Sequence, residues 1–221
     1  MSLNNDSRMN QDKHLNSLKK SHKPILEKPA QPVHKLPSPP PLLAHFTNLT
    51  IEQIQSVKKF IFFIGYGRSG HSVVASLMDA HPNMIIADEY YLFDKLAGDK
   101  GHKRRKQLST RSGLFNELYR NSYICVKSGR RNASSAHNTK NYHLGIEGMW
   151  QGRFDQLKVI GEKTGGATAM MYHDDKERFK TIYKQLETLA GVPLYAIHVV
   201  RNPYDMIATV ALYQASGPWS G

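Results

Sequence analysis

Short apolar runs alternate with amphipathic segments from about residue 58 onward. Five of the runs are continuous and rich in β-branched or aromatic residues, which is typical of strands buried on both faces of a sheet. The predicted strands are residues 60–64 (FIFFI), 84–87 (MIIA), 123–126 (YICV), 158–161 (KVIG) and 195–200 (YAIHVV). Such strands need helices to cover both sides of the sheet.

Helices are predicted in the segments between these strands. Residues 71–80 place four apolar side chains on one helical face, namely Val73, Val74, Leu77 and Met78. Residues 176–190 repeat apolar residues at helical spacing, and another helix lies near 113–120. A further helix begins at Asn202-Pro203, where asparagine suits the cap and proline the first position. Strands that alternate with helices predict an α/β fold with a central parallel sheet.

The composition of the chain changes near residue 50. Residues 1–50 carry seven Lys or Arg against three Asp or Glu and contain the stretch KPAQPVHKLPSPPPLL. A Pro-rich stretch without helical or strand periodicity favours extended polyproline conformations. We therefore predict a disordered, basic, Pro-rich tail over 1–50 and a folded domain over 58–221. A docking segment for a Pro-binding domain, or a stem, is the alternative interpretation of the tail.

The composition also excludes several classes of protein. The single cysteine, Cys125, cannot form an internal disulfide and is expected in the core, and the chain has no apolar run of about 18 residues that would span a membrane. The absence of an apolar signal segment favours the cytoplasm. The sequons at Asn5, Asn48 and Asn132 leave a secretory route open if the N-terminus is incomplete. The net charge of +12 predicts affinity for anions.

The most informative residues follow the first predicted strand, in the segment IGYGRSGHS over 64–72. Glycines allow successive N–H groups to point inward, and the helix that follows adds unpaired donors and the positive end of its dipole. We expect Gly67, Ser69, Gly70 and Ser72 to hold a phosphate or sulfate there, with Arg68 and His71. The alternative is a glycine turn whose arginine pairs with a nearby carboxylate.

The spacing G-x-x-x-x-G-x-S matches a Walker-type loop, but His71 occupies the place of the lysine. Nucleoside-triphosphate enzymes use that lysine to reach the β- and γ-phosphates, so its absence counts against ATP or GTP chemistry. A second anion-binding pattern lies far downstream. Arg201 ends an apolar strand, and Thr209 lies eight residues later on the next helix. A guanidinium fork with a hydroxyl suits a phosphate monoester, while pairing of Arg201 with Asp205 is the alternative.

The segment FIFFIGYGRSGHSVVASLMDAHPN, followed by a strand and Asp88-Glu89, resembles the sulfotransferases that use 3′-phosphoadenosine 5′-phosphosulfate (PAPS). It is most similar to the tyrosylprotein and carbohydrate sulfotransferase branch. In that family an R-S-G-T-T or K-S-G-T loop holds the 5′-phosphosulfate. An arginine at a strand end, with Ser or Thr eight residues later, binds the 3′-phosphate, and Arg201 and Thr209 keep that spacing. The resemblance covers about residues 58–93 and 158–213 and implies a P-loop-type three-layer αβα fold.

The resemblance also implies roles for individual residues in sulfuryl transfer to a hydroxyl or amine. Arg68 would neutralise the charge on the leaving nucleotide, and Glu89, in the place of the family's catalytic glutamate, would accept the proton of the acceptor. His71 stands where the family has threonine and is a second candidate base. The segment GEKTGG over 161–166 resembles a G-D-K-T motif, so Lys163 and Thr164 are expected to touch the sulfate or the acceptor.

No metal is expected, because a sulfuryl group carries less charge than a phosphoryl group and the histidines show no metal-binding spacing. The acceptor is a carbohydrate, a peptide tyrosine or a small alcohol. The alternatives are a P-loop kinase-like phosphotransferase and a non-catalytic basic module for anions or nucleic acid. The basic cluster at 103–111 has no interleaved aromatic residue, so we expect no nucleic-acid partner. The chain ends some twelve residues after Thr209, where the family continues, so it is either an incomplete domain or a reduced member of the family. An incomplete domain predicts weak cofactor binding and little or no turnover.

Overall fold

The computed structural model describes residues 38–98, 106–128 and 144–215. Residues 1–37 of the predicted tail, residues 102–105 of the basic run, and Arg130 and Arg131 lie outside these residues. The described part contains four strands in one parallel sheet, in the order β2-β3-β1-β4. Their bounds are β1 Lys59–Ile64, β2 Met84–Asp88, β3 Val159–Lys163 and β4 Leu194–His198.

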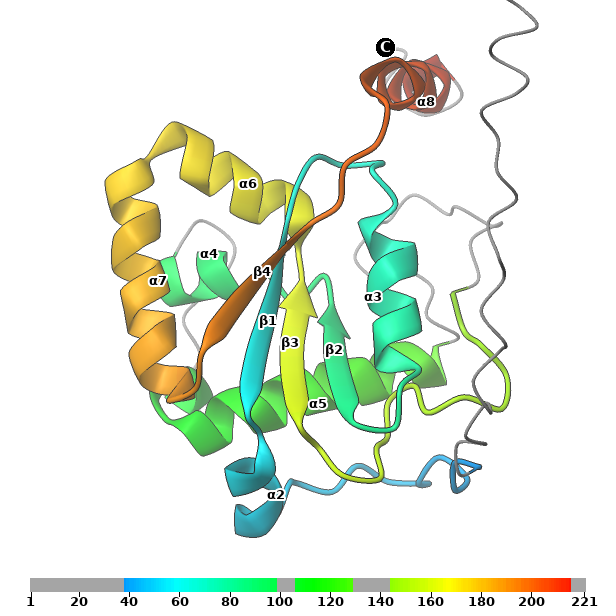
Figure 1. Ribbon diagram of the computed structural model, residues 1–221, viewed down its shortest axis with the longest axis vertical. Helices are drawn as coiled ribbons and strands as arrows, with labels where there is room; N and C mark the ends of the chain where they lie inside the picture. The colour runs from blue at the N-terminus through cyan, green and yellow to red at the C-terminus, as the bar shows by residue number, and fades with distance from the viewer. Residues whose placement is uncertain (1–37, 99–105, 129–143, 216–221) are drawn as a thin grey trace, which may run out of the picture. The chain divides into compact units, whose positions relative to one another are not determined.

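Helices cover both faces of this sheet, which confirms the predicted three-layer α/β architecture (Figure 1). Alternate residues of β1 face opposite layers, as the two-residue period of a strand requires. Phe60 and Phe62 join the larger core, whereas Ile61 and Phe63 join the smaller one beside α3. The helices are α2 Ile51–Ser56, α3 His71–Asp79, α4 Leu92–Ala97, the 3-10 turn η1 Lys106–Ser109, α5 Arg111–Lys127, α6 Gly165–Asp174, α7 Lys176–Ala190 and α8 Pro203–Ala215.

Four of the five predicted strands are confirmed, and the one at 123–126 is wrong. Those residues form the last turn of α5, which begins where the Thr110 hydroxyl accepts a hydrogen bond from the Gly113 N–H. The helix buries Leu114, Phe115 and Leu118 in the larger core, at the spacing of one helical face. A run of four apolar residues fits a buried strand and the buried side of a helix equally well. Cys125 is buried as predicted, but in this helix.

Two further expectations about burial are corrected. On α3, Val74 and Met78 pack against the smaller core, but Val73 and Leu77 are exposed. The helix buries His71, Ala75 and Asp79. Strand β4 is mostly accessible, and Tyr195 is 47% exposed. This strand is at the edge of the described sheet and pairs with β1 alone, so it lacks the cover that its apolar sequence predicts.

The residues just before α2 contact the folded domain. Leu49 is buried in the larger core, and the ring of Phe46 packs against Tyr119 and Tyr123 of α5. The Tyr123 hydroxyl also donates a hydrogen bond to the Leu43 carbonyl. The composition groups these residues with the tail, whereas their packing groups them with the domain. No helix among the described residues has the length and apolarity needed to cross a membrane.

One buried carboxyl group joins three separate segments of the domain. Asp79, at the end of α3, is fully buried. Its Oδ1 accepts hydrogen bonds from the Ile86 N–H of β2 (2.6 Å) and from the Ser122 hydroxyl of α5 (2.9 Å). Its Oδ2 accepts one from the Gly152 N–H (3.1 Å). Three donors from distant parts of the chain therefore depend on one side chain.

We expect Asp79→Asn to lower the free energy of unfolding by about 3 kcal/mol, because the new amide N–H₂ faces donors and leaves at least one of them buried and unpaired. Urea denaturation measures this change. Asp174→Asn, at a side chain that is 65% exposed, is the matched control and is expected to change stability by less than about 0.5 kcal/mol. Equal stability of the two variants would contradict this role for Asp79.

Candidate functional site

The carboxyl ends of all four strands meet at one edge of the sheet, because the strands are parallel. This is the edge at which open α/β sheets bind ligands. The loop after β1, the turn after β2, the start of α6 after β3 and the segment after β4 all begin there (Figure 1). Every predicted site residue lies on one of these four segments or on the helix that follows it, except Lys163, which ends β3.

Several residues of the loop after β1 have a positive φ, a conformation that glycine adopts most easily. Gly65 and Gly70 have φ values of 132° and 97°, and Arg68 has a φ of 67°. Gly70 caps the start of α3, and no side chain caps the first amides of that helix. A Cβ at Gly67 or Gly70 would meet nothing within 4 Å, so the loop leaves open space in front of its backbone.

Two polar features of this loop favour an anion. No side chain caps the first N–H groups of α3, which lie at the positive end of the helix dipole. The hydroxyl of Ser69, a residue that is 7% exposed, has no hydrogen-bond partner among the described residues. A buried hydroxyl without a partner in a folded protein is a candidate ligand contact.

The His71 side chain is buried at this edge of the sheet. It is 8% exposed, and its ring packs so close to Gly165 that a Cβ there would lie 2.9 Å from the ring. Burial, together with the charge of Lys163, lowers the pKa of His71 to about 4, although Asp88 acts in the opposite direction. The imidazole is therefore neutral near pH 7 and is a weak base there.

The centre of the site is a lysine with two carboxylates. The Lys163 side chain is fully buried at the end of β3, with its Nζ 2.6 Å from Asp88 Oδ1 and 2.5 Å from Glu89 Oε1. Burial alone lowers the pKa of Lys163, but the two carboxylates outweigh it and the pKa is raised. The lysine is thus charged, and its ammonium pairs with the carboxylates of Asp88 and Glu89 instead of facing solvent.

The turn that carries Glu89 has a strained backbone. Glu89 and Tyr91 have φ values of 47° and 58°, which are uncommon for residues with a side chain. The Glu89 N–H donates to the Lys163 carbonyl (2.8 Å), and the Tyr91 N–H donates to the Thr164 hydroxyl oxygen (2.9 Å). Strained conformations persist where the surroundings hold them, and they cluster at functional sites.

Helix α5 anchors the same turn from the other side. Its Asn121 accepts a hydrogen bond from the Asp88 N–H (2.7 Å), and its Glu117 accepts one from the Tyr90 hydroxyl (2.9 Å). Sequence reasoning missed both residues, because Asn121 and Glu117 belong to a polar helical pattern with no motif of their own. It also missed Glu162, although that residue stands beside Lys163 in the GEKTGG segment.

The two anion-binding motifs come together in space. Arg201 Nη1 donates a hydrogen bond to the Arg68 carbonyl (3.2 Å), across 133 residues of sequence. Its Nε lies 4.0 Å from Asp205 Oδ2, so the alternative pairing is present at the limit of an ion pair. The Thr209 hydroxyl donates to the Asp205 carbonyl within α8. Asn202 caps that helix as predicted, since its Oδ1 accepts from the Tyr204 N–H.

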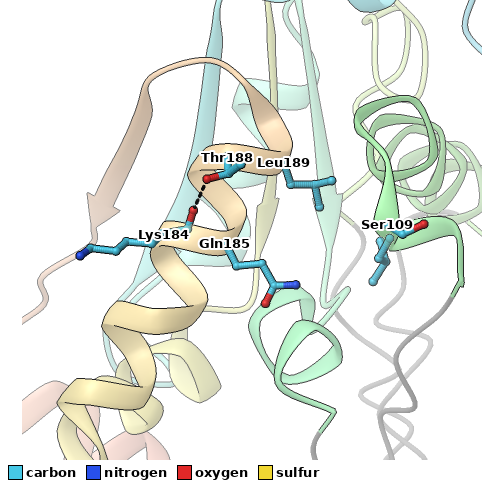
Figure 2. A pocket seen from close by; sticks show the side chains of 6 residues that line it. Ser109, Lys184, Gln185, Thr188 and Leu189 are labelled. Atoms are coloured by element: carbon cyan, nitrogen blue, oxygen red, sulfur yellow. Dashed lines mark hydrogen bonds between the residues drawn. The ribbon is translucent and has the colours of Figure 1, made fainter.

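Other features of the described chain lie outside this edge. A surface pocket of about 400 Å³ lies between η1 and α7, where Gln185 and Leu189 face Ser109 (Figure 2). It contains no predicted site residue. The part of the chain that the structure describes holds no group of three or more His, Cys, Asp or Glu side chains arranged for a metal ion.

No model of a known protein family matches the chain, and no curated protein matches it either. The function is therefore argued from the residues at this edge of the sheet.

The buried His71 predicts a specific pH dependence of stability. Its pKa is about 4 in the folded protein and near 6.5 when unfolded, so the unfolded chain binds more protons between these values. Stability therefore falls as the pH is lowered through this window. We expect wild type to lose about 2 kcal/mol more than His71→Gln on acidification from about pH 7 to about pH 4.5, after allowance for partial solvent screening.

Urea denaturation at several pH values measures the difference between the two proteins. His45→Gln, at an exposed position, is the control and is expected to keep the wild-type dependence on pH. Parallel curves for wild type and His71→Gln would show that the imidazole is not buried in the neutral form.

Proposed function

We propose that this chain binds PAPS at the edge formed by the four strand ends and transfers its sulfuryl group to a hydroxyl or amine acceptor. The observation that carries the proposal is the hydrogen bond from Arg201 to the Arg68 carbonyl. It joins the two anion-binding motifs at the same edge of the sheet as the turn that carries Glu89. A ligand with a phosphate at each end requires this arrangement of two separate anion sites on one surface.

The loop after β1 suits the 5′-phosphosulfate end. Uncapped amides at the start of α3, the open space at Gly67 and Gly70, and the unpartnered Ser69 hydroxyl are all features of an anion cradle. Ser72 lies in the first turn of the same helix, and Arg68 adds a guanidinium. The fit is to a phosphate or sulfate, and it does not depend on a side chain at the position of His71.

Arg201 and Thr209 suit the 3′-phosphate end. The Arg201 guanidinium is half exposed and keeps further N–H donors beyond the one that it gives to the loop. The Thr209 hydroxyl has to leave the Asp205 carbonyl before it donates to a phosphate, a rotation about one side-chain bond.

Bound PAPS supplies an activated sulfuryl group. Glu89 accepts the proton of the acceptor hydroxyl as the acceptor oxygen bonds to sulfur, and Lys163 holds the Glu89 carboxylate in place. Arg68 and the loop N–H groups neutralise the electron pair left on the phosphate oxygen when the old S–O bond breaks. Glu89 is preferred to His71 as the base, because the His71 ring is buried against Gly165, whereas the Glu89 side chain is 16% exposed at this edge.

The buried, neutral state of His71 also separates this proposal from a kinase-like phosphotransferase. A neutral, buried His71 stands where a nucleoside-triphosphate enzyme needs a charged lysine that reaches its β- and γ-phosphates. Lys163, which is buried at this edge among the described residues, already pairs with Asp88 and Glu89. ATP with magnesium is therefore the comparison ligand in the test.

Calorimetric titration with 3′-phosphoadenosine 5′-phosphate tests the nucleotide site. We expect Arg68→Ala and Arg201→Ala each to weaken binding about tenfold to a hundredfold, because each removes a charge-assisted contact to one phosphate. Arg120→Ala, at an exposed position on α5, is the matched control and is expected to bind as wild type does. Tighter binding of ATP with magnesium would favour the phosphotransferase, and binding of neither ligand would favour the non-catalytic basic module.

The catalytic role of Glu89 has its own test. Glu89→Gln keeps the shape of the side chain but removes the proton acceptor, so we expect transfer to fall about a hundredfold or more with the bisphosphate affinity nearly unchanged. The assay follows sulfate transfer from PAPS to a tyrosine peptide, a sugar and a small alcohol. Full activity of this variant with any acceptor would remove Glu89 from the mechanism.

A further inference from the structure

Two fully enclosed residues at the end of β3 are connected to the strained turn after β2. Thr164 and Glu162 are 2% and 0% exposed, so neither touches a ligand at the surface. We propose that Thr164 and Glu162 are positioning residues that hold the turn at Tyr91 and thereby aim Glu89. The restraint of the turn rests on the geometry alone, whereas its consequence for catalysis rests on the proposed function.

The hydrogen bonds form a chain with one consistent direction. The Thr164 hydroxyl donates its single proton to Glu162 Oε2 at 2.6 Å. Its oxygen is then oriented to accept, and it accepts the Tyr91 N–H at 2.9 Å. Glu162 thus fixes the rotation of the Thr164 hydroxyl, and Thr164 in turn fixes the backbone of the turn.

The turn needs restraint on both sides of its strained residues. Glu89 is held by the carbonyl and the ammonium of Lys163, two groups of one residue. Tyr91, two residues later, also has a positive φ and is held by Thr164. A left-handed conformation at such a residue costs about 1–3 kcal/mol, so loss of the Thr164 contact lets the turn relax.

The buried position of Glu162 is consistent with this role. Burial raises the pKa of Glu162 to about 8, and Glu89 and Asp94 also raise it, whereas the bond to Thr164 and the charge of Lys163 act to lower it. Glu162 is thus mostly protonated at neutral pH. It adds no third negative charge beside Asp88 and Glu89, and its Oε2 still accepts the Thr164 proton.

Thr164→Val tests the restraint, because valine keeps the shape and removes the hydroxyl. Amide hydrogen exchange of the Tyr91 N–H is the direct readout. We expect the exchange of this amide to become about tenfold faster or more in Thr164→Val, and to return to the wild-type rate in Thr164→Ser. Thr168→Val is the matched control, since Thr168 is 1% exposed and its hydroxyl donates to the Thr164 carbonyl in the first turn of α6.

The catalytic consequence has a separate readout. In Thr164→Val we expect kcat for sulfuryl transfer to fall about tenfold, with the KM for PAPS within about twofold of wild type, and we expect Thr164→Ser to restore kcat. Glu162→Leu removes the acceptor of the Thr164 proton and is expected to speed Tyr91 exchange, whereas Glu162→Gln keeps an oxygen there and is expected not to. These two variants test the same chain of bonds if Thr164→Val does not fold.

The outcomes separate this inference from the proposed function. Unchanged Tyr91 exchange in both Thr164→Val and Glu162→Leu would overturn the positioning role, whatever the activity. Faster Tyr91 exchange in those variants would support the restraint of the turn. If the wild-type protein then neither binds the bisphosphate nor transfers sulfate, the proposed function is overturned while the restraint stands. Faster exchange with an unchanged kcat would show that the turn does not aim Glu89.

Discussion

The candidate site depends on the buried ammonium of Lys163. It emerges from the end of β3 and lies within 2.6 Å of carboxylates on Asp88, which ends β2, and on Glu89, which follows it. A charge in the interior is stable only with such partners, and removal of Lys163 would leave both carboxylates without their cation in a poorly hydrated place. The Lys163 ammonium and its two carboxylates therefore join the neighbouring strands β2 and β3 at the edge where the loops meet. They also hold the Glu89 side chain in place.

The other loops at this edge are arranged around that ion pair. His71 lies close enough for Lys163 and Asp88 to influence its protonation, and its ring needs a glycine at position 165. Helix α5 supplies Asn121 and Glu117 to the turn after β2. The site is thus held by buried polar contacts from β3, α5 and α6, while the apolar cores on the two faces hold the sheet beneath it.

The sequence predicted well those elements whose signal is local. The strand at 60–64, the glycine loop and the helix at 176–190 each have a complete pattern within a few residues, and the structure has them. The apolar run at 123–126 has no such pattern, because four residues fit a strand or one side of a helix. Only the packing of α5 against the core decides between the two.

By itself the sequence determined the α/β class, the glycine loop after the first strand and the spacing of Arg201 and Thr209, because these follow from short-range periodicity and backbone preference. Only the tertiary structure decided that Lys163 is buried against residues 74 positions away and that Arg201 reaches a carbonyl 133 positions away. Such contacts depend on strand order and register, which parallel pairing across long connections sets. The partners of Glu89 are therefore a property of the folded sheet.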